Sequence, residues 1–100
     1  MIRVIYTWKV SARDRAEFVA RWRQVTTSIH ETTEGALGSF CLQSAEDEET
    51  ILTVALWRSE DGWRDFVGAA RTGSMKLLHE IATQVSAVPY RQLGDETVTP

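Results

Sequence analysis

This chain carries, at its centre, the stretch Ile51-Leu52-Thr53-Val54-Ala55-Leu56-Trp57, which decides the fold class. It predicts a β-strand with apolar side chains on both faces. The acidic run 46–49 precedes it and predicts a turn after another strand over about 37–45. A sheet with helices on one face has a polar opposite face unless something covers it. We therefore expect helices on one face and a second subunit on the other.

Upstream, the first ten residues alternate in polarity and predict another strand. Its apolar face is formed by Ile2, Val4, Tyr6, Trp8 and Val10. An amphipathic helix is predicted from Ser11 to about Glu34, with a capping box between Ser11 and Asp14 and a stop at Gly35. Its inward positions are Phe18, Val19, Trp22, Val25, Thr26 and Ile29.

Downstream, Ser59 is predicted to cap a short helix whose apolar stripe contains Trp63, Phe66 and Val67. After a break over 68–73, a third helix is predicted from Ser74. Its inward positions are Leu77, Leu78, Ile81, Ala82 and Val85. The last predicted strand, 88–93, contains Pro89, which favours an edge position.

The predicted order of elements is β-α-β-β-α-(α)-β, which is a ferredoxin-like α+β arrangement. We expect a single domain over residues 1–93 and a polar tail over 94–100. A symmetric homodimer with sheet against sheet would cover the second apolar face.

Composition excludes several classes of function. The formal net charge is −3 and no basic block exists, so nucleic acid is not an expected partner. No apolar stretch is long enough to span a membrane or to act as a signal peptide. The single cysteine, Cys41, cannot form an internal disulfide and favours a reducing cytoplasmic location.

Motifs for nucleotide, metal or nucleophile chemistry are absent from the sequence. It has no glycine-rich phosphate loop, no dinucleotide fingerprint and no paired cysteines. His30 and Glu34 share a helical face, but a second histidine is missing, so we expect an exposed polar patch there. Cys41 is expected to be a small core residue.

Aromatic side chains are the main candidates for a site. Tyr6 and Trp8 share a strand face, and His79 lies at the edge of the third predicted helix. With Trp57, Trp63 and Phe66 they could line one dry cavity for a flat organic ligand. The alternative is that these rings only pack the core.

Two segments resemble a known family. They are the opening strand followed by Phe18-Val19-Ala20-Arg21-Trp22, and the strand 51–56 followed by Trp57-Arg58-Ser59-Glu60-Asp61-Gly62-Trp63-Arg64-Asp65-Phe66. Over about residues 1–93 the chain resembles antibiotic biosynthesis monooxygenase domains. The resemblance implies a dimeric α+β barrel with a ligand between the sheet and the helices of each subunit.

Members of this family include cofactor-independent monooxygenases of aromatic polyketides and haem-degrading enzymes. Relative to the haem-degrading branch, Tyr6 replaces an asparagine, Phe66 replaces a tryptophan and His79 resembles the iron ligand. Relative to the polyketide branch, Trp57 matches a tryptophan, Trp63 replaces a tyrosine and Thr53 replaces an amide. Each branch is therefore matched in part.

The leading hypothesis is a cofactor-independent monooxygenase of a planar phenolic or enolic compound. Tyr6 would donate to the oxyanion and His79 would be the base or would orient the substrate. The predicted substrate-binding residues are Trp8, Thr53, Trp57, Trp63 and Phe66. One alternative is haem binding through His79. The other is a non-catalytic dimeric binding domain whose pocket is filled by Trp8, Trp22 and Phe40.

Overall fold

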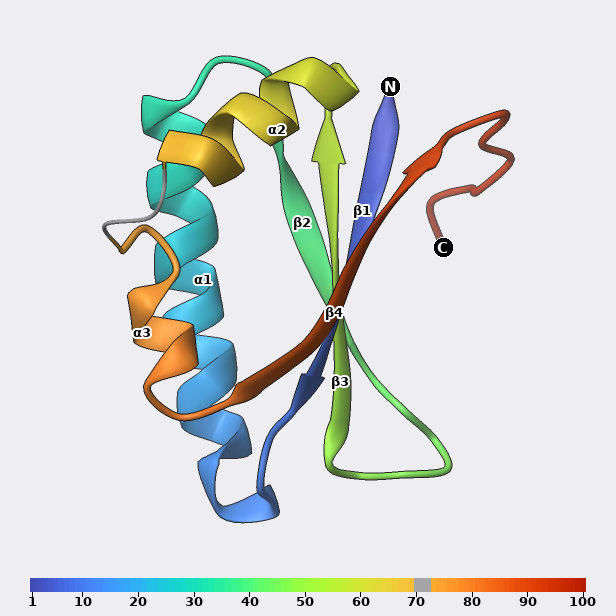
Figure 1. Cartoon of the computed structure of the whole chain (residues 1–100). Coiled ribbons are helices and arrows are strands. Elements are labelled where there is room, and N and C mark those ends of the chain that lie inside the picture. The colour runs from blue at the N-terminus through green and yellow to red at the C-terminus, as the bar shows by residue number, and fades with distance from the viewer. Residues whose placement is uncertain (70–72) are drawn as a thin grey trace.

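A four-stranded antiparallel sheet and a layer of helices form the protein (Figure 1). The computed structural model describes residues 1–69 and 73–100. The strands are β1 (Ile2–Lys9), β2 (Ala36–Gln43), β3 (Thr50–Trp57) and β4 (Thr83–Arg91). The helices are α1 (Arg15–Thr32), α2 (Glu60–Ala69) and α3 (Lys76–His79), and a 3₁₀ turn, η1 (Ala12–Asp14), precedes α1.

The strand order is β2-β3-β1-β4, with every neighbouring pair antiparallel. All helices lie on one side of the sheet, as Figure 1 shows. This arrangement confirms the predicted ferredoxin-like α+β fold. In the part of the chain that the structure describes, no helix combines the length and apolar character needed to cross a membrane.

The central strand β1 carries the core of the molecule. Its alternation is confirmed, because Ile2, Val4, Tyr6 and Trp8 are all buried. Phe18 of α1 is fully buried against this face, with its ring centroid 5.5 Å from that of Trp8. A side chain on this face of β1 therefore lies between the sheet and the helices, where a cavity could form.

The predicted helix boundaries at Gly35 and Ser59 are confirmed, whereas the one at Ser11 is wrong. Glu17 and Arg21 form an ion pair at 2.9 Å on α1, and Gly35, in the turn after α1, has a φ of +87°. The Ser59 Oγ atom accepts a hydrogen bond from the Gly62 amide at 3.1 Å and caps α2. The capping box predicted at Ser11 is wrong, since the Ser11 hydroxyl donates to the Asp14 carboxylate and caps no amide.

The third helix is much shorter than its spacing predicts. The structure has only the single turn α3, and β4 begins at Thr83 rather than at the predicted Val88. Leu78 is buried as expected, but Leu77 is 38% exposed and Val85 is 60% exposed. Pairing with β1 explains the difference, because the β4 backbone gains sheet hydrogen bonds as far back as Thr83. The predicted break over 68–73 begins too early, because α2 continues to Ala69, and residues 70–72 lie outside the described residues.

The sheet face that points away from the helices is largely apolar. One row of cross-strand partners consists of Val88, Ile5, Val54 and Phe40. Phe40 is 45% exposed and Val88 is 40% exposed. We call this surface the outer sheet face. Its apolar side chains agree with the prediction, from the β3 sequence, of a second apolar face that the helices do not cover.

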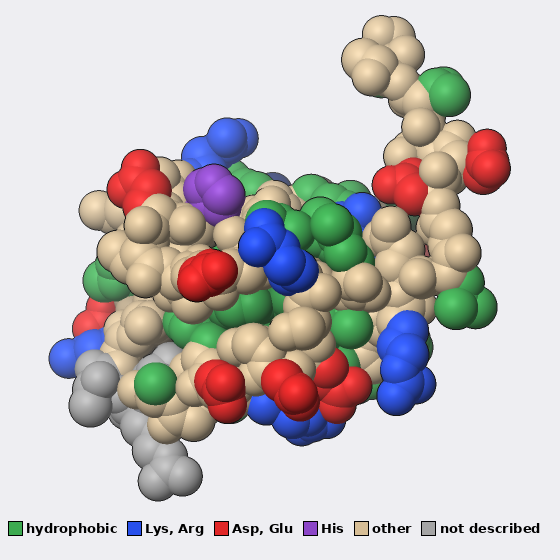
Figure 2. All heavy atoms as spheres, turned by 90° about the horizontal axis from the view of Figure 1, so that it is seen from above, with side chains coloured by type: hydrophobic (Ala, Val, Ile, Leu, Met, Phe, Trp, Pro, Cys, Tyr) green, Lys and Arg blue, Asp and Glu red, His purple; other side chains and the backbone are tan. Residues whose placement is uncertain are grey.

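Seen from above, the molecule presents acidic and basic side chains intermixed with hydrophobic ones (Figure 2). This distribution agrees with the modest net charge of −3.

Candidate functional site

Two adjoining cavities lie between the sheet and the helices. The outer cavity measures about 520 Å³, and its walls include Tyr6, Trp63, Phe66, Met75, His79 and Gln84. The inner cavity measures about 50 Å³, and its walls include Tyr6, His30, Thr53, Trp57, Phe66 and Met75. Among the described residues, Tyr6, Phe66 and Met75 line both cavities. Pockets for organic ligands typically measure about 300–1,000 Å³, so only the outer cavity has room for a complete planar ligand.

Tyr6 is held in place by a tryptophan of α2. The Trp63 Nε1–H group donates to the Tyr6 hydroxyl oxygen at 2.9 Å, and both side chains are buried. Burial raises the pKa of the Tyr6 hydroxyl, and the hydrogen bond from Trp63 offsets part of that rise. The hydroxyl therefore stays protonated and can donate its own hydrogen to a ligand.

His79 reaches the outer cavity from α3. The residue is exposed overall, and its ring lies against Trp8 with 5.3 Å between the centroids. Neither ring nitrogen of His79 has a hydrogen-bond partner among residues 1–69 and 73–100. A ligand in the outer cavity could therefore exchange a proton with His79 or bind it directly.

Trp8 and Thr53 form a buried pair beside the cavities. The Trp8 Nε1–H group donates to the Thr53 hydroxyl oxygen at 3.0 Å, and Trp8 has no exposed surface. Thr53 lines the inner cavity, whereas Trp8 lines neither cavity. The structure thus does not bring Trp8 into the same space as the other predicted substrate-binding residues.

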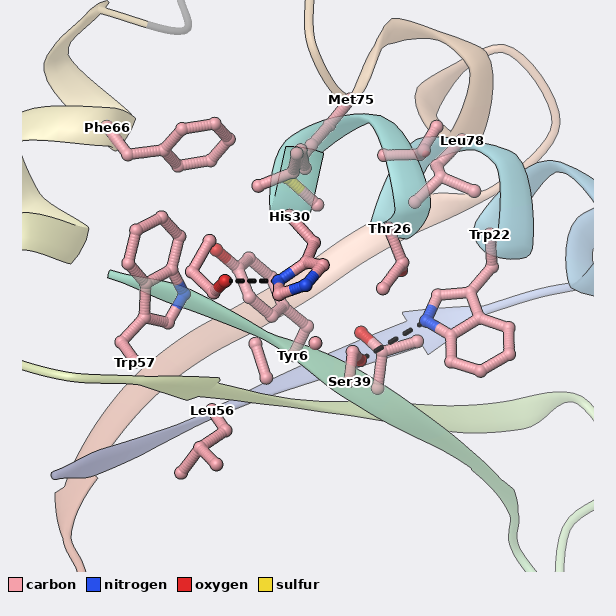
Figure 3. Close-up of a pocket in the computed structure, with 16 residues that line it drawn as sticks. Tyr6, Trp22, Thr26, His30, Ser39, Leu56, Trp57, Phe66, Met75 and Leu78 are labelled. Carbon is pink, nitrogen blue, oxygen red and sulfur yellow. Dashed lines mark hydrogen bonds between the residues drawn. The ribbon is translucent and has the colours of Figure 1, made fainter. Parts of the chain in front are cut away.

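Trp57 and Phe66 form the aromatic wall of the inner cavity (Figure 3). Their ring centroids are 5.2 Å apart and the planes are inclined by 40°. Phe66 also lines the outer cavity, so it separates the two spaces together with Tyr6 and Met75.

Wall residues that were not predicted from the sequence include His30 and Met75, whereas Trp22 was expected only to fill the pocket. His30 is exposed, as expected, but its ring also lines the inner cavity (Figure 3). Helical spacing could have placed His30 at the cavity, because it follows Thr26 by four residues and Thr26 is on the predicted inward stripe of the helix.

The pocket filling expected of a non-catalytic binding domain is not found. Trp22 lines the inner cavity, where its Nε1–H group donates to the Ser39 hydroxyl at 3.2 Å. Phe40 lies on the outer sheet face, with the Arg3 guanidinium 5.6 Å from its ring centroid. The outer cavity between the helices and the sheet therefore stays open.

Nucleophile and metal chemistry have little support among the described residues. Burial raises the pKa of the Cys41 thiol, and the nearby Arg23 offsets part of that rise, so the thiolate is not favoured. Within residues 1–69 and 73–100, no three His, Cys, Asp or Glu side chains gather to hold a metal ion.

These features define the class of protein: a ferredoxin-like α+β chain with aromatic cavities between its sheet and helices. The sequence profile described as antibiotic biosynthesis monooxygenase matches residues 1–73. The chain therefore belongs to the antibiotic biosynthesis monooxygenase family. No curated protein matches the chain.

Solved structures similar to this chain share its fold. A putative antibiotic biosynthesis monooxygenase from Bordetella bronchiseptica is 19% identical, with 92% of this chain and 96% of that chain covered and a TM-score of 0.78. The haem degrader MhuD from Mycobacterium tuberculosis, with two haems bound, is 22% identical, with 97% and 100% covered and a TM-score of 0.76. SnoaB, a cofactor-independent oxygenase from Streptomyces nogalater, is 13% identical, with 95% of each chain covered and a TM-score of 0.68.

Proposed function

We propose that this protein is a cofactor-independent monooxygenase that oxidises a planar phenolic or enolic aromatic compound with dioxygen. The observation that carries the proposal is the outer cavity of about 520 Å³, walled by Trp63 and Phe66, with the protonated Tyr6 hydroxyl at its wall. Its size fits a flat polycyclic ligand. The family membership and the similarity to a cofactor-independent oxygenase support the same activity.

The proposed reaction needs an electron-rich substrate anion. Loss of a proton from the substrate gives an enolate or phenolate that reacts directly with dioxygen. One oxygen atom enters the product, the other leaves as water, and the substrate supplies the electrons. Tyr6 would donate a hydrogen bond to the substrate oxyanion, and such a donor stabilises the charge as it develops.

The remaining predicted residues take supporting roles in this proposal. His79 would act as the base or orient the substrate in the outer cavity. Trp63 and Phe66 would clamp the aromatic body, and Trp57 and Thr53 would contact the substrate edge that reaches the inner cavity. Trp8 would act through Tyr6, whose ring centroid is 6.1 Å away in a stacked arrangement.

Dioxygen uptake with anthrone tests the proposal. The purified protein, without added metal or organic cofactor, should consume dioxygen and anthrone in equal amounts and release the quinone and water. Uptake no faster than in buffer alone, with anthrone and with related quinols, would contradict the proposed activity.

Haem binding is the second candidate, favoured by the His79 ring at the wall of the outer cavity, which has no hydrogen-bond partner among residues 1–69 and 73–100. His79 would be the iron ligand, and haem would supply an oxidising iron centre. Titration with haemin should then give a saturable Soret shift that His79→Ala abolishes. His30→Ala is the control, because His30 does not line the outer cavity. Without a Soret shift, this candidate fails.

We also propose a homodimer formed through the outer sheet face. Exposed apolar patches of this kind commonly mark interfaces, and a two-fold axis would place the patch against itself. The double variant Phe40→Lys/Val88→Lys should be monomeric by light scattering and should keep the circular dichroism of the original protein. Gln24→Lys, an exposed change on α1, is the control. A monomeric unaltered protein would contradict the proposed dimer.

The proposed location of the protein is the cytoplasm. The single, partly buried Cys41 agrees with a reducing compartment.

A further inference from the structure

Strand register gathers three residues at one end of the inner cavity. Ala36 of β2 is the cross-strand partner of Trp57 of β3. His30, near the end of α1, reaches back over the turn at Gly35 so that its Nδ1 atom lies 2.7 Å from the Ala36 carbonyl oxygen. Figure 3 shows the His30 and Trp57 rings on the walls of this space, and a dashed line marks the hydrogen bond from His30 to the Ala36 carbonyl oxygen.

The hydrogen bond to Ala36 selects one tautomer of His30. A backbone carbonyl oxygen only accepts hydrogen bonds, so Nδ1 must carry the hydrogen. In the neutral ring, Nε2 then presents a lone pair and can accept a proton. Because the Ala36 carbonyl fixes the tautomer, Nε2 is the ring nitrogen of His30 that can accept a proton.

Trp57 adds an unused donor to the same cavity. The other three tryptophans donate their Nε1–H groups to Thr53, Ser39 and Tyr6. For Trp57, no hydrogen-bond acceptor of the Nε1–H group lies within the part of the chain that the structure describes. Trp57 lines the inner cavity, so the oxygen of a ligand in that cavity is a natural acceptor for this indole.

Charge considerations single out His30 as the proton acceptor of the inner cavity. Among the described wall residues, the titratable side chains are Tyr6 and His30. Burial raises the pKa of Tyr6, which keeps its proton. Glu31 and Glu34, the acidic neighbours of His30 along the chain, are exposed and do not line the cavity.

We propose that His30 is the catalytic base: its Nε2 atom accepts the hydroxyl proton of the substrate while the Trp57 Nε1–H group donates to the resulting oxyanion. The O–H bond breaks, its electron pair stays on oxygen, and the proton forms the imidazolium of His30. The inner cavity, at about 50 Å³, holds the hydroxyl-bearing edge of the ligand, while the ring occupies the outer cavity. This inference rests on the proposed monooxygenase function, and it leaves His79 to orient the substrate.

A matched pair of variants separates the proton-accepting role of His30 from its hydrogen bond to the Ala36 carbonyl. In His30→Asn the side-chain amide can still donate to the Ala36 carbonyl, because it occupies the place of Nδ1, but no proton acceptor replaces Nε2. His30→Ala removes both functions. If His30 is the base, kcat with anthrone should fall about 10²-fold or more in both variants. If its role is structural, His30→Asn should keep nearly full turnover, which would overturn the proposal.

Para-nitrophenol gives a readout that needs no turnover, because the phenol and the phenolate absorb at different wavelengths. At a slightly acidic pH, where the free phenol is mostly neutral, the original protein should bind the probe and increase the phenolate band. His30→Asn should bind it as the neutral phenol, and Trp57→Phe should weaken the band. The proposal is overturned if the original protein does not bind the probe, if it gives no phenolate band, or if His79→Asn rather than His30→Asn removes that band.

The two proposals fail in different ways. A phenolate band that depends on His30, without dioxygen uptake for any aromatic substrate, would remove the monooxygenase but keep the proton-accepting site. Dioxygen uptake that persists at full rate in His30→Asn would keep the monooxygenase and remove His30 as its base.

Discussion

Replacing Tyr6 by Phe should lower kcat for anthrone oxidation by about 10²–10³-fold, the loss observed when one oxyanion donor is removed from an active site. The ring stays in place and fills the same volume, so both cavities keep their walls. Only the hydroxyl that donates to the substrate oxyanion is lost. Steady-state dioxygen uptake measures the effect directly.

The chain offers a matched control in its other tyrosine. Tyr90 on β4 is 54% exposed and is the cross-strand partner of Arg3. It lies on the outer sheet face and lines neither cavity. Tyr90→Phe should keep the kcat of the original protein. Tyr6→Phe also leaves the Trp63 indole without its acceptor, which costs about 1–3 kcal/mol, so thermal melting must show that the variant is folded. A folded Tyr6→Phe variant with full turnover would remove Tyr6 from the mechanism.

Replacing Trp8 by Ala should lower the free energy of unfolding by about 3–5 kcal/mol, as in other buried aromatic-to-alanine changes. Trp8 has no exposed surface and packs against Phe18, Tyr6 and His79. Domains of this size are stable by only about 5–15 kcal/mol, so the variant should be folded marginally, if at all, at physiological temperature. Urea unfolding followed by circular dichroism measures the loss.

Two further changes calibrate the Trp8 result. Thr53→Val keeps the volume but leaves the Trp8 indole without its acceptor, so it should cost about 1–3 kcal/mol. Val85→Ala, at a position that is 60% exposed, should change stability by less than about 0.5 kcal/mol. If Trp8→Ala costs no more than Val85→Ala, Trp8 does not anchor the core.

Local sequence patterns predict the fold well where one face of an element is buried. The alternation of β1 and the spacing of Phe18 and Val25 on α1 identify both elements, because one side of each faces the core. The segment from Leu77 to Val85 fails for the opposite reason. Its apolar spacing suits a helix, but hydrogen bonds from β4 to the distant strand β1 decide its conformation.

The candidate site is predictable only in part, because contacts between distant segments decide which side chains line the cavities. Alternation places Tyr6 and Trp8 on the same face, but it cannot tell that Trp8 is sealed off by Thr53 and Phe18. His30 lines the inner cavity and binds the Ala36 carbonyl across a turn whose path the helical pattern does not define. The sequence thus identifies the aromatic content of the site better than its walls.

The indole hydrogen bonds also link the cavities to the order of folding. Trp63 is tied to Tyr6 across 57 positions of the chain, and Trp8 is tied to Thr53 across 45. Such pairs close only after distant segments have met, and contacts of this range form slowly. We therefore expect α1 and its local ion pairs to form before the aromatic cavities. The capacity to take up a ligand should appear in the same kinetic phase as the complete sheet.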